Sequence, residues 1–326
     1  MTGYIRATSV VLAASAAVAL AGCASPSAGE AEDELTIVAS TDVYGDIASA
    51  IVGDRASVTS IISGSAQDPH SYEATARDQL ALSRADIVIE NGGGYDPFID
   101  TLLAALEEPA PVVLTVTDIS GLLGEGSAHE HAEDEHAEEE HAEEDSHEGH
   151  DHSEGNEHVW YSFEAIHALA EEVAHHLAEL DAEGAEEYEA NLASFESGLE
   201  GLEERAYELH EQYEGAGVAV TEPAPLYLFE EIGLVNQTPA EFSSAIEAGT
   251  DVAPSVLLEM QQLIESGSLA LLAYNEQTSG PETDQVVALA EEQGLPVVTI
   301  AETLPEGIGY LDWMSDNLDA ISSALS

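Results

Sequence analysis

Side chains that could bind a metal ion are most concentrated in this 326-residue sequence between positions 129 and 158. In this tract, eight histidines are interspersed with acidic residues. Neutral imidazole and carboxylate groups both bind divalent transition metals, and tracts of this composition are typical of metal binding. The tract has almost no apolar residues to offset the entropy of ordering, so we expect a disordered loop over residues 125–157. A solvated acidic spacer is the alternative, although Glu, Asp, Ser and Gly alone would keep such a loop soluble. The expected metal-gathering histidines of this loop are His129, His131, His136, His141, His147, His150 and His152.

Four further residues have types and positions that predict one metal site. His70 follows a predicted strand, and His158 ends the acidic tract just before a predicted helix. Glu222 and Glu302 each come within two residues of the end of a predicted strand. Ligands in open α/β sheets bind at the carboxyl ends of the strands, so we expect these side chains to meet there. Two imidazoles and two carboxylates suit zinc, manganese or iron, and Glu276 is a rival for the fourth ligand.

Taken singly, each of these four residues has an ordinary explanation. A histidine in a loop is most often a surface residue, and a glutamate after a strand is most often a helix cap or a solvated side chain. The joint pattern is what predicts the site. Because both histidines must be deprotonated to bind a metal, we expect binding to depend on pH near their reference pKa of about 6.5.

Strands and helices alternate along the chain on both sides of the tract, which predicts parallel sheets. The fold class is therefore α/β, with two Rossmann-like lobes of mainly parallel sheets, joined by one long linking helix and enclosing a cleft. The expected lobes cover residues 35–180 and 215–326, and the linking helix covers 181–214. Strands are expected at residues 35–40, 57–62, 85–90, 111–116, 217–221, 268–273 and 296–300. Helices are expected at residues 42–52, 75–83, 96–107, 162–180, 182–214, 223–232, 254–265, 281–293 and 310–325.

The start of the chain reads as a targeting segment. Residues 1–22 carry one arginine and then an apolar run rich in Ala and Val, too short for a comfortable membrane span, which predicts a signal peptide. The segment ends in Leu-Ala-Gly-Cys, which resembles the bacterial lipobox, so we expect Cys23 to be lipidated. Residues 23–34 would form a flexible tether that holds the protein outside the cytoplasmic membrane.

The formal net charge of -61, with five arginines and no lysine, excludes a nucleic-acid binder, which needs a basic surface. An acidic surface attracts divalent cations, and it equally favours solubility at high salt. Composition does not choose between these two interpretations. A monomer is the default expectation for a tethered receptor.

Several motifs together resemble the zinc and manganese solute-binding proteins of bacterial ABC transporters, over nearly all of the mature chain. The motifs are Asp68-Pro69-His70-Ser71-Tyr72-Glu73, His158-Val159-Trp160 after a His-rich insertion, Thr221-Glu222, Glu302-Thr303-Leu304 and Tyr310-Leu311-Asp312-Trp313-Met314. The resemblance implies that His70, His158, Glu222 and Glu302 hold a metal ion between the lobes. It also implies delivery of that ion to an ABC permease, with limited closure because the linking helix is rigid.

Two departures from the family pattern bear on the metal. Zinc-binding members commonly have histidine at the third position, where this chain has Glu222, and aspartate is usual where it has Glu302. Two histidines with two carboxylates are similar to the manganese-binding members, whereas the His-rich tract is typical of zinc-binding ones. Intrinsic affinity favours zinc, so zinc is the preferred prediction and manganese, or iron, the alternative.

Two other classes of protein compete with a receptor. A secreted metallohydrolase would keep an open position on its zinc, but the His-Glu-x-x-His and Gly-x-Ser-x-Gly motifs are both missing from the sequence. An extracellular metal buffer or adhesin would depend on the tract alone. In that case His70→Ala would leave tight binding intact.

Overall fold

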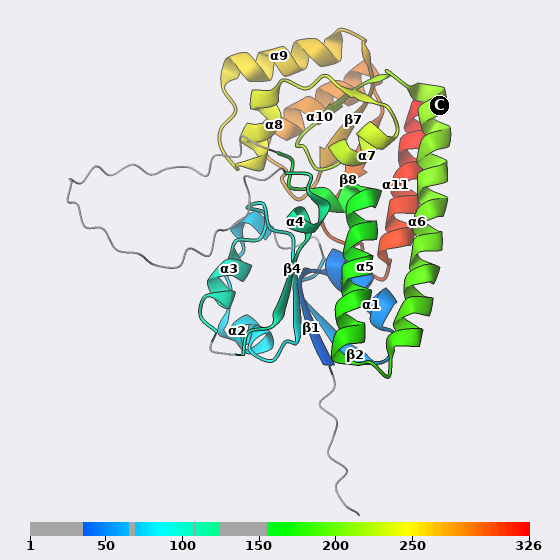
Figure 1. The fold of residues 1–326 in the computed structure, drawn as a ribbon. Helices are drawn as coiled ribbons and strands as arrows, with labels where there is room; N and C mark the ends of the chain where they lie inside the picture. Colours follow the sequence, from blue (N-terminus) through cyan, green and yellow to red (C-terminus); the bar gives the residue numbers. More distant parts are fainter. Residues whose placement is uncertain (1–34, 65–68, 107–108, 124–154) are drawn as a thin grey trace, which may run out of the picture. The chain divides into compact units, whose positions relative to one another are not determined.

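The computed structural model describes residues 35–64, 69–106, 109–123 and 155–326, and two parallel four-stranded sheets organise them (Figure 1). The first sheet has the order β2-β1-β3-β4. All of its pairings are parallel, and β1 pairs with both β2 and β3. The strands are β1 (Leu35–Thr41), β2 (Ala56–Ile62), β3 (Ile87–Glu90) and β4 (Val112–Thr115).

Both faces of the first sheet are covered, which is why its central strands are apolar without alternation. On one face, Ile37 and Ile89 pack with α1 (Asp42–Val52) and α5 (Phe163–Leu180). On the other face, Val38 and Val88 pack with α2 (Ala76–Leu82) and α3 (Phe98–Leu103). Neighbouring residues of one strand therefore enter different hydrophobic clusters, as the alternation of side chains along a strand requires.

The second sheet repeats this plan with the order β6-β5-β7-β8, again all parallel. Its strands are β5 (Gly217–Val220), β6 (Val235–Asn236), β7 (Leu269–Asn275) and β8 (Val297–Ile300). Ala219 and Leu272 pack with the helices of one face, and Val218 and Leu271 with those of the other. The helices of this half are α7 (Leu226–Glu231), α8 (Ala240–Glu247), α9 (Pro254–Glu265), α10 (Pro281–Gln293) and α11 (Tyr310–Leu325).

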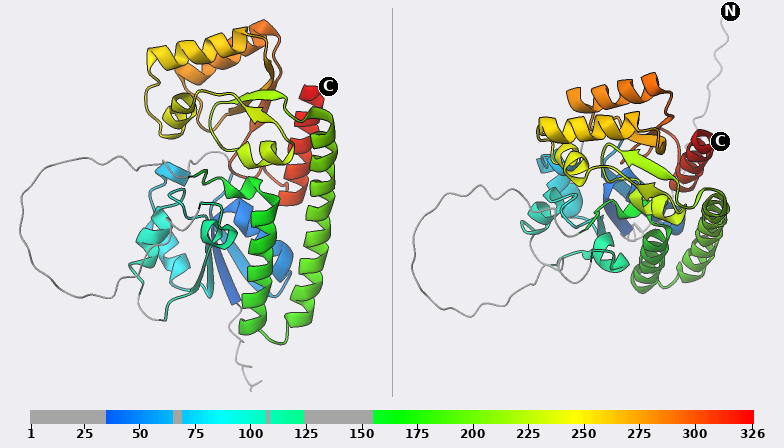
Figure 2. Two further views of the ribbon diagram at one scale, coloured as in Figure 1. Left: turned by 45° about the horizontal axis from the view of Figure 1, so that its top comes forward. Right: turned by 90° about the horizontal axis from the view of Figure 1, so that it is seen from above.

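One helix, α6 (Ala185–Tyr213), runs without a break for 29 residues between the two halves of the chain. At 1.5 Å per residue it is about 44 Å long. It lies beside α5 and α11 (Figure 2). From Phe195 to Leu209 its buried residues recur every three or four positions. They join a hydrophobic cluster that also contains strand residues of both sheets, including Ile37 and Leu271. The helix therefore packs against both halves. Its buried side chains are Tyr188, Phe195, Leu199, Leu202, Ala206 and Leu209.

The predicted fold class, two parallel α/β halves with a long helix, is confirmed. Some short elements were missed, namely α4 (Val116–Ser120), α8, β6 and the 3-10 turns η1 (Pro69–Ser71) and η2 (Val159–Tyr161). The predicted helix at 96–107 is shorter, because α3 spans Phe98–Leu103. Elements of two to eight residues give too few turns or alternations for a period to be recognised.

The predicted signal peptide, the predicted tether with Cys23, and the histidines of the tract from 129 to 152 lie outside the described residues. In the part of the chain that the structure describes, none of the helices is both long and apolar enough to cross a membrane.

Candidate metal centre

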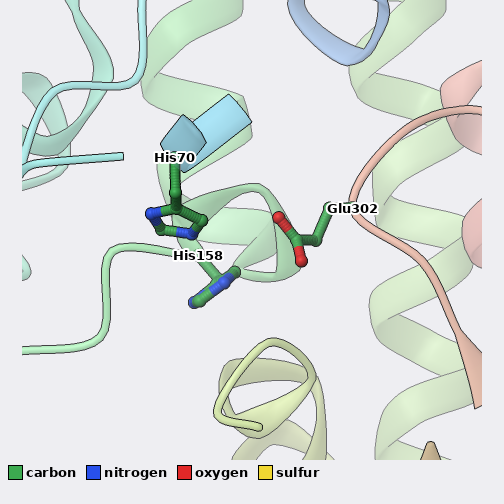
Figure 3. A group of neighbouring side chains, drawn as sticks. All are labelled: His70, His158 and Glu302. Atoms are coloured by element: carbon green, nitrogen blue, oxygen red, sulfur yellow. The ribbon is translucent and has the colours of Figure 1, made fainter. Parts of the chain in front are cut away.

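Three of the predicted ligands converge on one point. His70, His158 and Glu302 each place one possible ligand atom within 4.8 Å of the other two (Figure 3). His70 lies in η1, after β2, and His158 is the residue that caps η2. Glu302 follows β8 by two residues. Figure 3 shows the three side chains gathered at one place, although the residues come from distant parts of the sequence.

Glu222, the fourth predicted ligand, lies beside Glu302 and is 2% exposed. The two carboxylates share one donor, because Asn275 Nδ2 donates to Oε1 of Glu222 and, at 2.7 Å, to Oε1 of Glu302. Asn275 is the last residue of β7, and its backbone N–H donates to Thr221 Oγ1 at 3.1 Å. The exits of β5, β7 and β8 thus bring Glu222, Asn275 and Glu302 together, as parallel neighbours must.

Glu276, the rival for the fourth ligand, is exposed, whereas Asn275 beside it is buried. Consecutive residues at a strand end point in opposite directions, so Asn275 faces the carboxylates and Glu276 faces solvent. Within the described residues, Glu276 belongs to none of the groups of possible ligands that lie within 4.8 Å of one another.

His158 is held in a form suited to metal binding. Its Nδ1 lies 2.7 Å from Asn156 Oδ1, so the tautomer that donates from Nδ1 leaves the lone pair on Nε2. Nε2 is buried and has no hydrogen-bond partner. Burial, and then the nearby His70, holds the pKa of His158 well below its usual value. The ring is therefore neutral near pH 7, which corrects the sequence-based expectation of titration near 6.5.

Aromatic rings surround the two imidazoles. Tyr95 packs edge-on to His70 with 4.9 Å between ring centroids, and Trp160 packs edge-on to His158 at 5.0 Å. Both aromatic side chains are almost fully buried. They exclude water and leave the imidazoles few alternative orientations. Trp160 also places a natural fluorophore next to one predicted ligand.

The buried carboxyl groups repel one another in the absence of a cation. Burial raises the pKa of Glu222 well above its usual value, and the Glu302 charge raises it further. Burial also raises the pKa of Glu247 to about 8, with the charges of Glu157 and Glu302 as the next causes. Metal-free protein near pH 7 therefore holds protons that an arriving cation displaces.

Sequence reasoning missed three polar residues at this centre: Glu157, Glu247 and Asn275. Glu157 immediately precedes His158 and is 3% exposed. Glu247 is the last residue of α8, a helix that the sequence analysis did not predict. Asn275 lies within two residues of the end of a predicted strand, and that position could have identified it as a residue of the site. The same kind of position identified Glu222 and Glu302.

Two parallel-sheet α/β halves joined by one long helix form the fold of the periplasmic metal-binding proteins. One such structure is the periplasmic zinc binding protein TroA from Treponema pallidum, with a TM-score of 0.70 and 16% identity over 90% of this chain and 99% of that one. Another is the protein FpvC from Pseudomonas aeruginosa in complex with Mn²⁺, with a TM-score of 0.69 and 22% identity over 90% and 98%.

A family model described as "Zinc-uptake complex component A periplasmic" matches residues 37–324. The chain belongs to this family, whose members are solute-binding proteins of metal ABC transporters. The manganese-binding lipoprotein MntA of Halalkalibacterium halodurans is 27% identical over 95% of each chain. The iron ABC transporter substrate-binding lipoprotein MtsA of Streptococcus pyogenes serotype M1 is 26% identical over 94% of each. The predicted family is confirmed.

Proposed function

We propose that this protein is the extracytoplasmic receptor of a metal ABC transporter, which captures one divalent transition-metal ion and delivers it to the permease. The observation that carries the proposal is the convergence of buried donors from both halves of the chain. His70 and His158 of the first half and Glu302 of the second each place a ligand atom within 4.8 Å of the other two. Glu222 lies outside that group of three, but it shares the Asn275 donor with Glu302. Only an ion held between the halves would use all four.

Four protein ligands favour holding a metal over catalysis at it. A catalytic zinc site keeps one position open for water or substrate, whereas two imidazoles and two carboxylates complete a tetrahedral set. Binding and release of the ion, without a chemical reaction, are therefore the proposed activity. Asn275 would orient both carboxylates from outside the ligand set.

Motion between the halves is expected to be small. Tyr161 Oη donates to Ala301 O at 2.7 Å, and Tyr310 Oη donates to Trp160 O at 2.8 Å. Asp46 Oδ2 accepts from Tyr310 N at 2.7 Å. These bonds join residues of the first half to the segment from 301 to 310, next to Glu302. Lobes at 35–180 and 215–326 with a linking helix at 181–214 remain our proposal for the domains, and a monomer remains our proposal for the assembly.

Zinc is the metal we favour. The order of intrinsic affinities places zinc above manganese and iron at a mixed nitrogen and oxygen site, and the His-rich tract suits zinc. The specific observation in favour of manganese or iron is Glu222, a hard oxygen donor where zinc-binding members commonly have histidine. Relatives named for manganese and for iron support that alternative.

The proposed location is the outer face of the cell membrane, with residues 1–22 removed and a lipid on Cys23 at the start of the tether, residues 23–34. The relatives named as lipoproteins support this location. The histidines from His129 to His152 would gather ions and pass them to the buried site. Deletion of residues 129–152 should then weaken uptake mainly when the metal is scarce. Unchanged growth of the deletion strain under chelation would contradict a gathering role.

Competition titrations with zinc and manganese, read by the fluorescence of Trp160, test the metal site. In a Trp313→Phe background Trp160 is the one remaining tryptophan, and its ring lies next to that of His158. We expect one tight equivalent with zinc preferred, and loss of tight binding in His70→Ala and Glu222→Ala. One tight equivalent with manganese preferred would support the alternative metal.

The matched pair Glu302→Gln and Glu276→Gln separates the two candidates for the fourth ligand. Both substitutions remove one negative charge after a strand of the same sheet, but Glu302 is buried and Glu276 is exposed. We expect a large loss of affinity only in Glu302→Gln. Tight binding that survives both His70→Ala and Glu302→Gln would refute the proposed receptor site and favour a buffer that depends on the tract.

A further inference from the structure

A second group of possible ligands lies beside the first and shares one residue with it. His70, Glu157 and Glu247 each place one ligand atom within 4.8 Å of the other two. Glu157 comes from the segment before η2, and Glu247 comes from the end of α8. The group therefore also joins the two halves of the chain, and it offers one nitrogen and two carboxylate donors. The four proposed ligands include only His70 from this group.

The carboxyl group of Glu247 is buried and lacks a hydrogen-bond partner on one of its oxygens. Its side chain is 7% exposed, and its Oε1 is buried with no hydrogen-bond partner. His158 Nδ1 lies 3.8 Å from Oε1, but that nitrogen already donates to Asn156 Oδ1 at 2.7 Å. Burial of a carboxylate without a compensating charge costs several kcal/mol. A divalent cation would compensate both Glu247 and the nearby Glu157.

The second group lies closer to solvent than the first. Gly155, two residues before Glu157, and Ala248, directly after Glu247, are both exposed. In contrast, Val159, directly after His158, and Thr303, directly after Glu302, are both buried. Glu247 itself is partly exposed, whereas His158 and Glu302 are 0% and 2% exposed, so an ion that comes from solvent would meet Glu247 before it meets either of them.

We propose that His70, Glu157 and Glu247 form an outer cation position, which a divalent transition-metal ion occupies on its way into and out of the buried site. This inference rests on the proposed function of that site. Because His70 belongs to both groups, one ion at a time is bound, and His70 stays coordinated while the other ligands exchange. The ion passes between the two positions without regaining its full hydration shell, so capture and release are both faster.

Anomalous diffraction at the zinc edge locates the outer position directly. In zinc-soaked crystals of His158→Ala, which lacks an inner ligand, we expect a peak bounded by His70, Glu157 and Glu247. The peak should disappear in His158→Ala/Glu247→Gln and persist in His158→Ala/Glu241→Gln, because Glu241 is exposed on the same helix. Glu302→Gln serves as a second inner variant if His158→Ala does not fold.

The outcomes of this experiment separate the two proposals. A wild-type peak at the inner position, with none at the outer position in either inner variant, overturns this inference alone. A peak in the inner variants that persists after Glu247→Gln also overturns it. Wild-type crystals with no peak among His70, His158, Glu222 and Glu302 overturn the proposed function, whatever the inner variants show.

Stopped-flow mixing with zinc, followed by Trp160 fluorescence, tests the role of the outer position in an otherwise intact protein. Glu247→Gln should slow both association and dissociation, each by about tenfold, because glutamine cannot lose a proton to become an anionic ligand for the passing ion, and charge in such sites changes association rates by that order or more. The dissociation constant should change far less than either rate, and Glu241→Gln should behave as wild type. A change in dissociation alone, or no change in either rate, overturns the outer position as a step on the path.

Discussion

Asn275→Leu is the substitution that most sharply tests how the second sheet builds the site. Asn275 Nδ2 donates to Oε1 of both Glu222 and Glu302, and the side chain is 1% exposed. Leucine is similar in size but donates no hydrogen bond, so neither carboxylate keeps its orientation toward the ion. The proposed ligands all remain present.

The magnitude follows from the role of Asn275 in orienting two ligands. Loss of a residue that orients metal ligands typically costs about 10–100-fold in affinity. We therefore expect zinc to bind about 10–100-fold more weakly to Asn275→Leu, which is about 1.4–2.8 kcal/mol. The assay is the competition titration read by Trp160 fluorescence.

Asn236→Leu is the control, because Asn236 ends β6 of the same sheet but is exposed and contacts Thr238. Circular dichroism would show whether both variants keep the wild-type fold. Affinity in folded Asn275→Leu equal to that of the wild type would refute the reasoning, because the orientation of the two carboxylates would then contribute nothing to binding.

Three other expectations follow from burial and charge. Burial raises the pKa of Glu90 to about 8, so the stability that its protonated form contributes is present at pH 4 and is lost as pH rises through 8. Between pH 5 and 8 the free energy of unfolding, measured in urea, should therefore fall by about 3–4 kcal/mol more in the wild type than in Glu90→Gln. Glu73→Gln, at an exposed position, should keep the wild-type pH dependence. Leu199→Ala, in the fully buried stripe of α6, should lower the free energy of unfolding by about 2–5 kcal/mol, and an unchanged urea midpoint would show that α6 packs less tightly than described. The affinity for zinc should fall by about tenfold per pH unit below the raised pKa of Glu222, because each ion displaces one proton. An affinity that does not change with pH would show that Glu222 is ionised before the metal arrives.

Periodicity predicted the long elements of the fold well. The apolar runs of β1 and β3 and the long stripe of α6 recur over enough residues to identify each type of element. Their alternation predicted parallel sheets. The short helix α8 was missed because its two buried apolar residues, Phe242 and Ile246, do not establish a helical period.

Glu222 and Glu302 were predicted as ligands from the sequence, because ligands bind at the carboxyl ends of strands. The same rule applied to Asn275, but an amide attracts less attention than a carboxylate as a metal ligand. Glu247 was beyond prediction, because it depends on how α8 packs against the first half of the chain. The pKa of His158 also depends on tertiary burial, which a sequence does not reveal.

A crystal structure of the protein with one equivalent of zinc would show whether the buried donors hold the ion. We expect one ion at the point where His70, His158 and Glu302 converge, with Glu222 completing the set, at distances of about 2.0–2.2 Å from the nitrogen and oxygen ligands. A single equivalent bound only by residues outside this group, with His158 Nε2 still uncoordinated, would contradict it.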